Sequence, residues 1–276
     1  MVSDDLVINY RSYPHQREIH ESPARIRVVA WPIRSGKDYC SVADAILRTG
    51  ECHYIWRERD LSPKWHVWLV GPTYPLTMQL WRDLKHMMPR ELMNGSPNES
   101  DMYIPLIDDG LIEMKSADKP ERLVASGLDL IHGTECGLWK KEVWGDSLRG
   151  RLSSPGRGPY SDGRGYAMLN GTPRGQYIGM EMHWFYHLLL LGRTNDNKDY
   201  ISSFYWFEDK VRFDNREHPI MSPKELREAR DDKSMSERDF RQNYLGEFLP
   251  MVAGEPILER YNPIIHVSEF EFNPAH

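Results

Sequence analysis

The chain has 276 residues, of which 40% are hydrophobic and 28% charged, and its formal net charge is −6. This length fits one large domain or a core with a small subdomain, and the negative balance excludes a protein coated throughout with basic nucleic-acid-binding residues. The three cysteines are too few and too scattered for a disulfide framework or a cysteine-type zinc site. The longest apolar run, Trp184–Leu191, is too short to span a bilayer. We therefore expect a soluble, intracellular protein without a signal peptide.

Short apolar runs alternate with helix-like stretches, which predicts an α/β fold with a mostly parallel sheet flanked by helices. Strands are expected at Arg27–Trp31, His66–Val70, Leu128–His132 and Tyr166–Asn170, and helices at Lys37 to about Arg48 and at Thr73–Met88. The turn pair Asp109-Gly110 lies between two apolar pairs, so a hairpin is expected over Ile104–Met114.

The texture of the sequence changes after about Asn195. Residues Tyr200–Phe207 predict a further strand, and Ser222–Asn243 predicts a strongly charged helical region that opens with a capping pattern. We therefore divide the chain into a core, residues 1–195, and a small appended subdomain, residues 196–276.

The stretch Val28–Asp38 has the order strand, loop and helix that a phosphate-binding loop requires. In such a loop, backbone N–H groups and the helix N-terminus bind phosphate, Gly36 leaves room for the approach, and Lys37 reaches the terminal phosphates. The predicted nucleotide contacts are Pro32, Ile33, Arg34, Ser35, Gly36, Lys37 and Asp38, with Arg34 as a phosphate contact from the same chain. Taken alone, the tripeptide Ser35-Gly36-Lys37 also fits a plain strand-to-helix turn with a surface lysine.

Further motifs lie in order around this loop. They are Tyr13-Pro14-His15-Gln16, His66–Tyr74, Gly127–Glu135, Leu169–Gly175 and Phe240–Phe248. In that order and at those spacings, the chain resembles the ATPase half of the large terminase subunit, the DNA-packaging motor of tailed double-stranded DNA viruses. The resemblance runs from about Tyr13 to Phe248. It implies a P-loop NTPase fold of the ASCE type with a small C-terminal lid subdomain, and ATP and Mg²⁺ as cofactors.

The resemblance also assigns roles to single residues. Gln16 falls in the adenine-recognition element, although a helix N-terminal turn explains the same motif. Glu135, Lys37 and Arg34 are the implied catalytic residues, with Glu135 orienting the attacking water. The turn Gly171-Thr172-Pro173 matches the family's coupling motif, and a tight turn without function is the alternative.

Two departures from the family pattern concern the same metal ion. The hydroxyl expected after Lys37 is a carboxylate, Asp38, and the carboxylate expected before Glu135 is a hydroxyl, Thr134. A reciprocal exchange would keep one hard anion and one hydroxyl as Mg²⁺ ligands at Asp38 and Thr134. The competing interpretation is a decayed site that binds nucleotide poorly and hydrolyses little.

A ring motor of this family uses an arginine from the neighbouring subunit, and the candidates here are Arg122, Arg149 and Arg151. The stretch Arg149–Arg164 carries four arginines, and it fits a loop that grips DNA phosphates as well as it fits a solvated surface loop.

The leading hypothesis is an ATP-driven translocase of double-stranded DNA, acting as a homo-oligomeric ring at a viral portal in the host cytoplasm and monomeric in isolation. The small terminase subunit and a separate nuclease are the other implied partners, since Glu247, Glu255 and Glu259 do not rebuild the family's nuclease. No contact with a membrane is expected. The alternatives are a nucleotide-binding structural subunit whose hydrolysis is lost and a small-molecule kinase, which Glu135 and the coupling motif disfavour.

Overall fold

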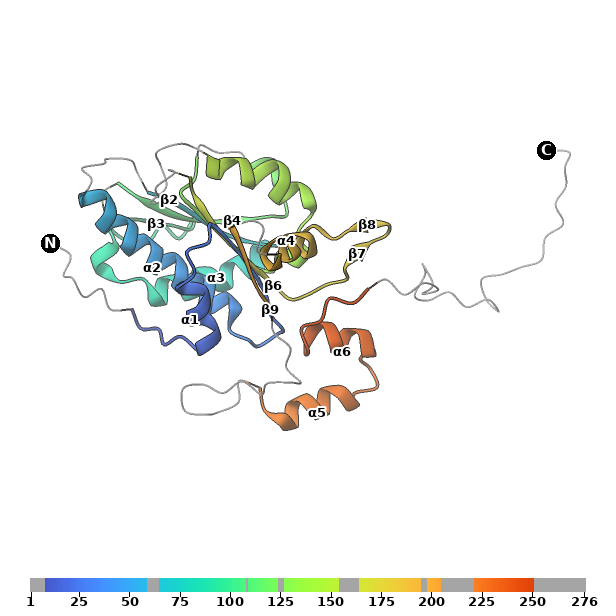
Figure 1. Cartoon of the computed structure of the whole chain (residues 1–276). Helices are drawn as coiled ribbons and strands as arrows, with labels where there is room; N and C mark the ends of the chain where they lie inside the picture. Colours follow the sequence, from blue (N-terminus) through green and yellow to red (C-terminus); the bar gives the residue numbers. More distant parts are fainter. Residues whose placement is uncertain are drawn as a thin grey trace, which may run out of the picture.

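The structure, a computed structural model, describes residues 8–58, 65–107, 109–123, 127–153, 164–194, 198–204 and 221–250. A seven-stranded sheet in the order β3-β4-β2-β5-β6-β1-β9 runs through the molecule, with helices on both of its faces (Figure 1). Its strands are β1 (Ile26–Ala30), β2 (His66–Gly71), β3 (Tyr103–Pro105), β4 (Leu111–Ser116), β5 (Leu130–Gly133), β6 (Tyr166–Gly171) and β9 (Tyr200–Phe204). All neighbours are parallel except β3 and β4, so the predicted fold class is confirmed.

The α-helices are α1 (Pro14–His20), α2 (Lys37–Glu58), α3 (Tyr74–Met87), α4 (Trp184–Arg193), α5 (Pro223–Asp231) and α6 (Glu237–Asn243). Short 3-10 turns occupy Arg90–Leu92, Pro120–Leu123, Cys136–Leu138 and Arg149–Ser153, and Val143–Leu148 forms a π-helical segment. A small hairpin, β7 (Tyr177–Ile178) and β8 (Glu181–Met182), stands apart from the main sheet (Figure 1). Within the described ranges, every helix is too short or too polar to cross a membrane.

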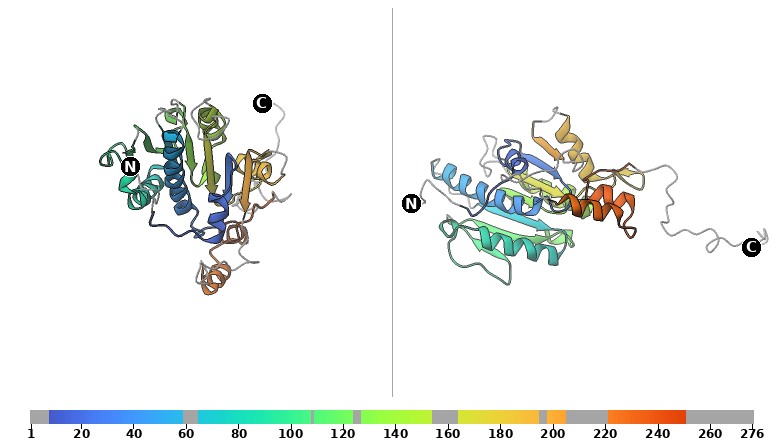
Figure 2. Two further views of the ribbon diagram at one scale, coloured as in Figure 1. Left: turned by 60° about the vertical axis from the view of Figure 1, so that its left-hand side comes forward. Right: turned by 90° about the horizontal axis from the view of Figure 1, so that it is seen from below.

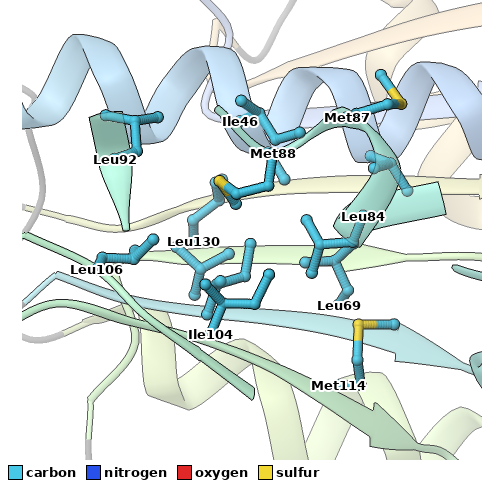
Figure 3. Close-up of a cluster of buried hydrophobic side chains, with 14 of the residues drawn as sticks. Ile46, Leu69, Leu84, Met87, Met88, Leu92, Ile104, Leu106, Met114 and Leu130 are labelled. Atoms are coloured by element: carbon cyan, nitrogen blue, oxygen red, sulfur yellow. The ribbon is translucent and has the colours of Figure 1, made fainter. Parts of the chain in front are cut away.

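The central strands are buried on both faces, as expected for parallel strands between two helical layers. All five residues of β1 and all six of β6 are buried. Successive side chains of a strand point to opposite faces, and β2 shows this clearly. Leu69 packs toward α2 and α3, in the cluster with Ile46 and Leu84 that Figure 3 shows, whereas Trp68 packs toward α4.

Local signals predicted the hairpin and the helix starts well. Strands β3 and β4 pair antiparallel around a turn in which Asp109 has a φ of 58°. Pro75 lies in the first turn of α3, where its missing N–H costs nothing. The predicted helical region 222–243 is two helices, α5 and α6. Ser234 donates its backbone N–H to the Asp232 side chain, and this local turn interrupts the helix.

Strand β9 lies in the range that the sequence assigned to the appended subdomain. It pairs in parallel with β1 over Tyr200–Phe204, and thus belongs to the main sheet. The two helices after it are the part that sits apart, near the end of β1 that leads into the phosphate loop (Figures 1 and 2). The core therefore includes β9, and the boundary at residue 195 was placed too early for this strand.

Candidate functional site

The loop between β1 and α2 forms the floor of the site. Arg34 and Gly36 both have positive φ, 61° and 73°, and this left-handed pair bends the chain so that α2 begins at Lys37. A side chain at residue 36 would be strained at that φ and would also meet the Gln16 amide at 2.9 Å. The Ser35 hydroxyl donates to the Pro32 carbonyl at 2.7 Å and closes the loop. The predicted strand–loop–helix order is therefore present.

Lys37 and Glu135 meet across this floor. Glu135 follows β5 and Lys37 opens α2, and the ammonium nitrogen lies 2.8 Å from Oε1 of the carboxylate. Both side chains are largely shielded from solvent, with 6% and 19% exposure. Carboxyl ends of parallel strands are where α/β sheets place ligands, and both groups stand at that edge.

The carboxylate of Glu135 is held from a second direction by Thr172, which follows β6. Thr172 donates its backbone N–H to Oε2 at 3.3 Å and its hydroxyl to Oε1 at 3.4 Å. Burial alone would raise the pKa of Glu135, but Lys37, the Thr172 N–H and the charge of Arg174 outweigh it and lower that pKa. Glu135 is therefore a fixed anion, as a residue that orients water requires.

Asp38 occupies the position after Lys37 and has an unsatisfied carboxylate oxygen. Within the described part of the chain, its Oδ1 atom is buried and accepts no hydrogen bond. Burial raises the pKa of Asp38, and Glu135 adds to the rise, while Lys37 and Asn170 oppose it. A buried, unpaired carboxylate oxygen is costly unless a cation or a proton joins it.

Thr134 shows a different arrangement. Its side chain is buried, its backbone N–H donates to the Val70 carbonyl at 2.9 Å, and its hydroxyl points to the same oxygen at 3.5 Å. The hydroxyl therefore faces β2 as well as the site, and this geometry gives less support to a metal-binding role for Thr134 than for Asp38. Among the described residues, no three His, Cys, Asp or Glu side chains gather as a metal cage.

Asn170, which was not predicted as a site residue, connects three of the motifs. From the end of β6 its amide nitrogen donates to the Ser41 hydroxyl at 2.6 Å and to the Lys37 carbonyl at 3.3 Å. The backbone N–H of Glu135 approaches its amide oxygen at 3.5 Å. A polar residue in an otherwise apolar buried strand was the available signal.

Arg174 was also missed. It lies two residues after Thr172, and its charge is among the groups that lower the pKa of Glu135. Its Nε atom is buried and makes no hydrogen bond within the described residues. An arginine directly after the coupling motif was the available signal.

The coupling motif itself is tightly packed. Gly171, Thr172 and Pro173 are buried, and a Cβ atom at Gly171 would lie only 3.0 Å from the backbone nitrogen of Gly137. Farther along, Gln176 binds the C-terminal segment through backbone and side chain, to the carbonyls of Leu249 and Phe248.

The appended helices contact the phosphate loop directly. The backbone N–H of Ile33 donates to the Asn243 carbonyl, at the end of α6, at 2.8 Å. Ile33 also packs against the small apolar cluster of Met221, Ala229, Phe240 and Leu245. A lid that moves would therefore pull on the loop at Ile33.

Gln16 lies at the loop but its amide already has protein partners. Its nitrogen donates to the Gly36 carbonyl at 3.1 Å, and its oxygen accepts from Tyr13 N–H and the Tyr10 hydroxyl. The side chain is 1% exposed. These contacts favour a role in holding the loop, and adenine recognition by Gln16 stays a prediction.

The arginines proposed to act on a neighbouring subunit lie away from this cluster in the sequence and differ in exposure. Arg122 and Arg149 are exposed, and Arg149 lines a surface pocket of about 390 Å³ with Trp144 and Trp184. Arg151 donates to the Ser147 carbonyl at 3.3 Å. In the basic stretch, Arg164 pairs with Asp199 at 2.6 Å, and residues 154–163 lie outside the described ranges.

Comparison with known proteins gives the same relatives from sequence and from structure. No family model matches the chain. The large terminase subunits of Thermus phage G20c and Thermus virus P23-45 are each 22% identical to it over 205 residues, covering 67% of this chain and 37% of the relative. The chain thus spans little more than a third of the length of these relatives.

Solved structures agree in fold. The large terminase ATPase domain of Thermus phage P74-26 superposes with a TM-score of 0.64 at 19% identity, covering 87% of this chain and 95% of that one. The large terminases of bacteriophage HK97 and of a thermophilic bacteriophage give TM-scores of 0.61 and 0.57 at 10% and 16% identity, and 87% of this chain covers 51% and 54% of theirs. The predicted resemblance is confirmed, and the fold is that of a large terminase ATPase domain.

Proposed function

We propose that this chain is the ATPase of a viral DNA-packaging motor, a terminase-like enzyme that hydrolyses ATP to move double-stranded DNA into a procapsid. The observation that carries the proposal is the meeting of three motifs. Lys37, Glu135 and Thr172 come from α2 and from the ends of β5 and β6, and they contact one another at one edge of the sheet. The similarity to large terminases, one of them from a thermophilic bacteriophage and solved in complex with ADP, supports the same function.

The arrangement supplies the parts that hydrolysis needs. Lys37 and the backbone of the loop would hold the terminal phosphates, with Arg34 as a further contact. Glu135, kept ionised by its neighbours, would orient a water for attack and accept its proton. Thr172 would report the loss of that phosphate, because it already holds Glu135 on one side and continues into Gln176 on the other.

Mg²⁺ fits this site through Asp38. Its buried Oδ1 atom has no hydrogen bond within the described residues, and a hard carboxylate oxygen is the ligand that Mg²⁺ prefers. Bound there, the ion would neutralise charge on the phosphates. Thr134 remains the second proposed ligand of the reciprocal exchange.

The partners follow from the same proposal. They are double-stranded DNA, the portal, the small terminase subunit and a separate nuclease, with the chain monomeric in isolation and joined in a ring at the portal vertex in the host cytoplasm. Arg122, Arg149 or Arg151 of one subunit would then complete the site of the next.

A second candidate is a nucleotide-binding structural subunit with weak or lost hydrolysis. The Thr134 hydroxyl, aimed at the Val70 carbonyl where the family places a metal-binding carboxylate, favours it. Measurement of phosphate release with Mg²⁺ or Mn²⁺, with and without double-stranded DNA, separates the two. The motor predicts metal-dependent release that DNA stimulates, whereas nucleotide binding without turnover under all these conditions would contradict it.

A further inference from the structure

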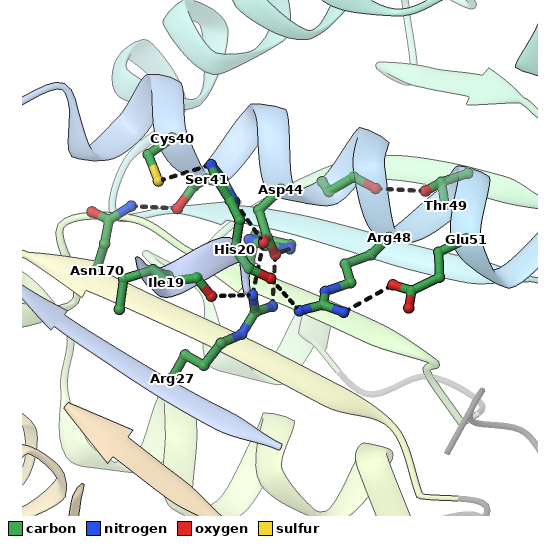
Figure 4. Close-up of polar contacts among 12 residues, drawn as sticks. Ile19, His20, Arg27, Cys40, Ser41, Asp44, Arg48, Thr49, Glu51 and Asn170 are labelled. Atoms are coloured by element: carbon green, nitrogen blue, oxygen red, sulfur yellow. Dashed lines mark hydrogen bonds and ion pairs between the residues drawn. The ribbon is translucent and has the colours of Figure 1, made fainter. Parts of the chain in front are cut away.

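A chain of buried polar contacts links the interior of α2 to the phosphate loop. Asp44 Oδ1 lies 2.9 Å from Nδ1 of His20, and Nε2 of His20 lies 2.9 Å from the Tyr10 hydroxyl. Tyr10 lies 3.0 Å from the Gln16 amide oxygen, and the Gln16 nitrogen holds the Gly36 carbonyl at 3.1 Å. Figure 4 shows the inner half of this chain, around His20, Asp44 and Arg27.

Backbone groups fix the direction of the hydrogen bonds at the loop end. The N–H of Tyr13 can only donate, and it faces Oε1 of Gln16 at 2.9 Å. The carbonyl of Gly36 can only accept, so Nε2 of Gln16 must face it. Because Oε1 accepts, the Tyr10 hydroxyl donates its single proton to Gln16 and has none to give to His20.

The inner end is fixed by charge. Arg27 donates to both oxygens of Asp44, at 2.7 and 2.6 Å. Although burial would raise the pKa of Asp44, Arg27 and its other partners hold it well below its usual range. Asp44 is therefore a carboxylate that only accepts, and Nδ1 of His20 must donate to it. Since Nε2 must donate to Tyr10, both ring nitrogens carry protons and the ring is an imidazolium.

The groups around the ring are compatible with this charge. They are Tyr10 before α1, Arg27 on β1, Cys40, Asp44, Arg48 and Glu51 on α2, and His132 on β5. Burial lowers the pKa of His132 to about 3, which keeps that ring neutral. Burial raises the pKa of the Tyr10 hydroxyl and of the Cys40 thiol, so both stay protonated. Arg48 is paired with Glu51, and the His20 side chain is 11% exposed, so its proton can exchange with solvent.

We propose that protonated His20 is a positioning residue that fixes the phosphate loop through Tyr10 and Gln16. A neutral ring has one proton to share between Asp44 and Tyr10. If Asp44 keeps it, Tyr10 turns its own proton to His20 and Gln16 loses that donor, so the hold on Gly36 loosens. The inference rests on the proposed function only where it predicts that this loosening weakens ATP binding.

Two measurements on the whole protein test the link without ATP. In ¹⁵N-histidine-labelled protein at about pH 6.5, the ring signal that disappears in His20→Gln should show protons on both nitrogens. Hydrogen exchange of the peptide around residues 33–40 should be faster in His20→Gln and in Tyr10→Phe than in the wild type at equal pH. A neutral His20 ring at that pH, or unchanged exchange in both variants, would overturn the proposal.

ATP affinity gives the functional readout. Raising the pH through the midpoint of the His20 signal should weaken wild-type binding about three- to tenfold, the worth of one hydrogen bond, beyond the change seen in His20→Gln. His66→Gln is the matched control, because His66 also contacts a carboxylate, Glu113 at 2.6 Å, but lies far from the loop in sequence. Parallel pH profiles for the wild type and His20→Gln would contradict the proposal. Absence of ATP binding in every variant would contradict the proposed function instead, and the ring and exchange measurements would still decide the role of His20.

Discussion

Nζ of Lys37 lies 2.8 Å from Oε1 of Glu135, so the lysine of the phosphate loop and the carboxylate after β5 form an ion pair across the site. A phosphate group that binds Lys37 competes for the same ammonium. Binding would therefore free one oxygen of Glu135 to contact water, while Thr172 keeps hold of the carboxylate. The pair thus connects nucleotide binding to the release of the catalytic base.

Lys37→Ala should abolish nucleotide hydrolysis and leave the chain folded. The lysine stands at the start of α2 and contacts Glu135, so its charge serves the site more than the apolar core. Phosphate release and circular dichroism check the two parts. Lys141→Ala is the control, because Lys141 pairs with Glu181 at the same 2.8 Å on the surface and should leave hydrolysis unchanged. Retained hydrolysis in a folded Lys37→Ala protein would refute the assignment of the phosphate loop.

Asp38→Asn should raise the melting temperature of the metal-free protein, and the gain should grow with pH. Because the pKa of Asp38 is raised, charging it costs stability above its ordinary value, and the full cost is reached above the raised value. The amide avoids this cost. Thermal unfolding from about pH 4 to about pH 8 measures it. The exposed Asp146→Asn is the control, and a pH-independent difference for Asp38→Asn would show that Asp38 is not a buried charge.

The metal exchange predicts a non-additive pair of substitutions. Asp38→Ser alone removes the carboxylate beside the metal, and Thr134→Asp alone places two carboxylates there, so each should reduce metal-dependent hydrolysis. The double substitution restores the family's usual pair and should recover activity, with a favourable coupling energy well above about 0.5 kcal/mol. Additive losses would support the decayed-site interpretation, with the metal held without Thr134.

Assembly should raise the activity of each chain. If an arginine of one subunit completes the next site, dilute protein should hydrolyse ATP slowly, and specific activity should rise with concentration or on DNA. Arg122→Ala or Arg149→Ala should remove that rise and leave the slow basal rate. Arg227→Ala, an exposed arginine on α5, is the control. Full activity independent of concentration would exclude an arginine supplied by a neighbour.

Much of this fold could be predicted from local signals. Apolar runs located the strands of the central sheet, and Asp109-Gly110 located a hairpin whose turn has the positive φ that such pairs favour. Strand order could not be predicted in this way. The pairing of β9 with β1 joins residues far apart in sequence, and it depends on packing of α4 against both strands rather than on any local pattern.

The site was predicted in outline but not in its contacts. Motif order gave Lys37, Glu135 and Thr172, whereas Asn170 and Arg174 became visible only when β6 was placed beside β5. Gln16 shows the reverse case. Its residue type suited adenine, but tertiary packing gave its amide three protein partners. Which of several possible hydrogen-bond partners a side chain takes is decided by the fold.

The most direct test of this account is hydrolysis and binding of ATP by Glu135→Gln, measured side by side. The substitution keeps the shape of the side chain and removes the negative charge that orients water and accepts its proton. We predict that Glu135→Gln binds ATP with Mg²⁺ at least as tightly as the wild type, because Lys37 loses a competing anion. Single-turnover hydrolysis should fall by about a hundredfold or more. Turnover equal to that of the wild type would place the catalytic base elsewhere and contradict the central claim.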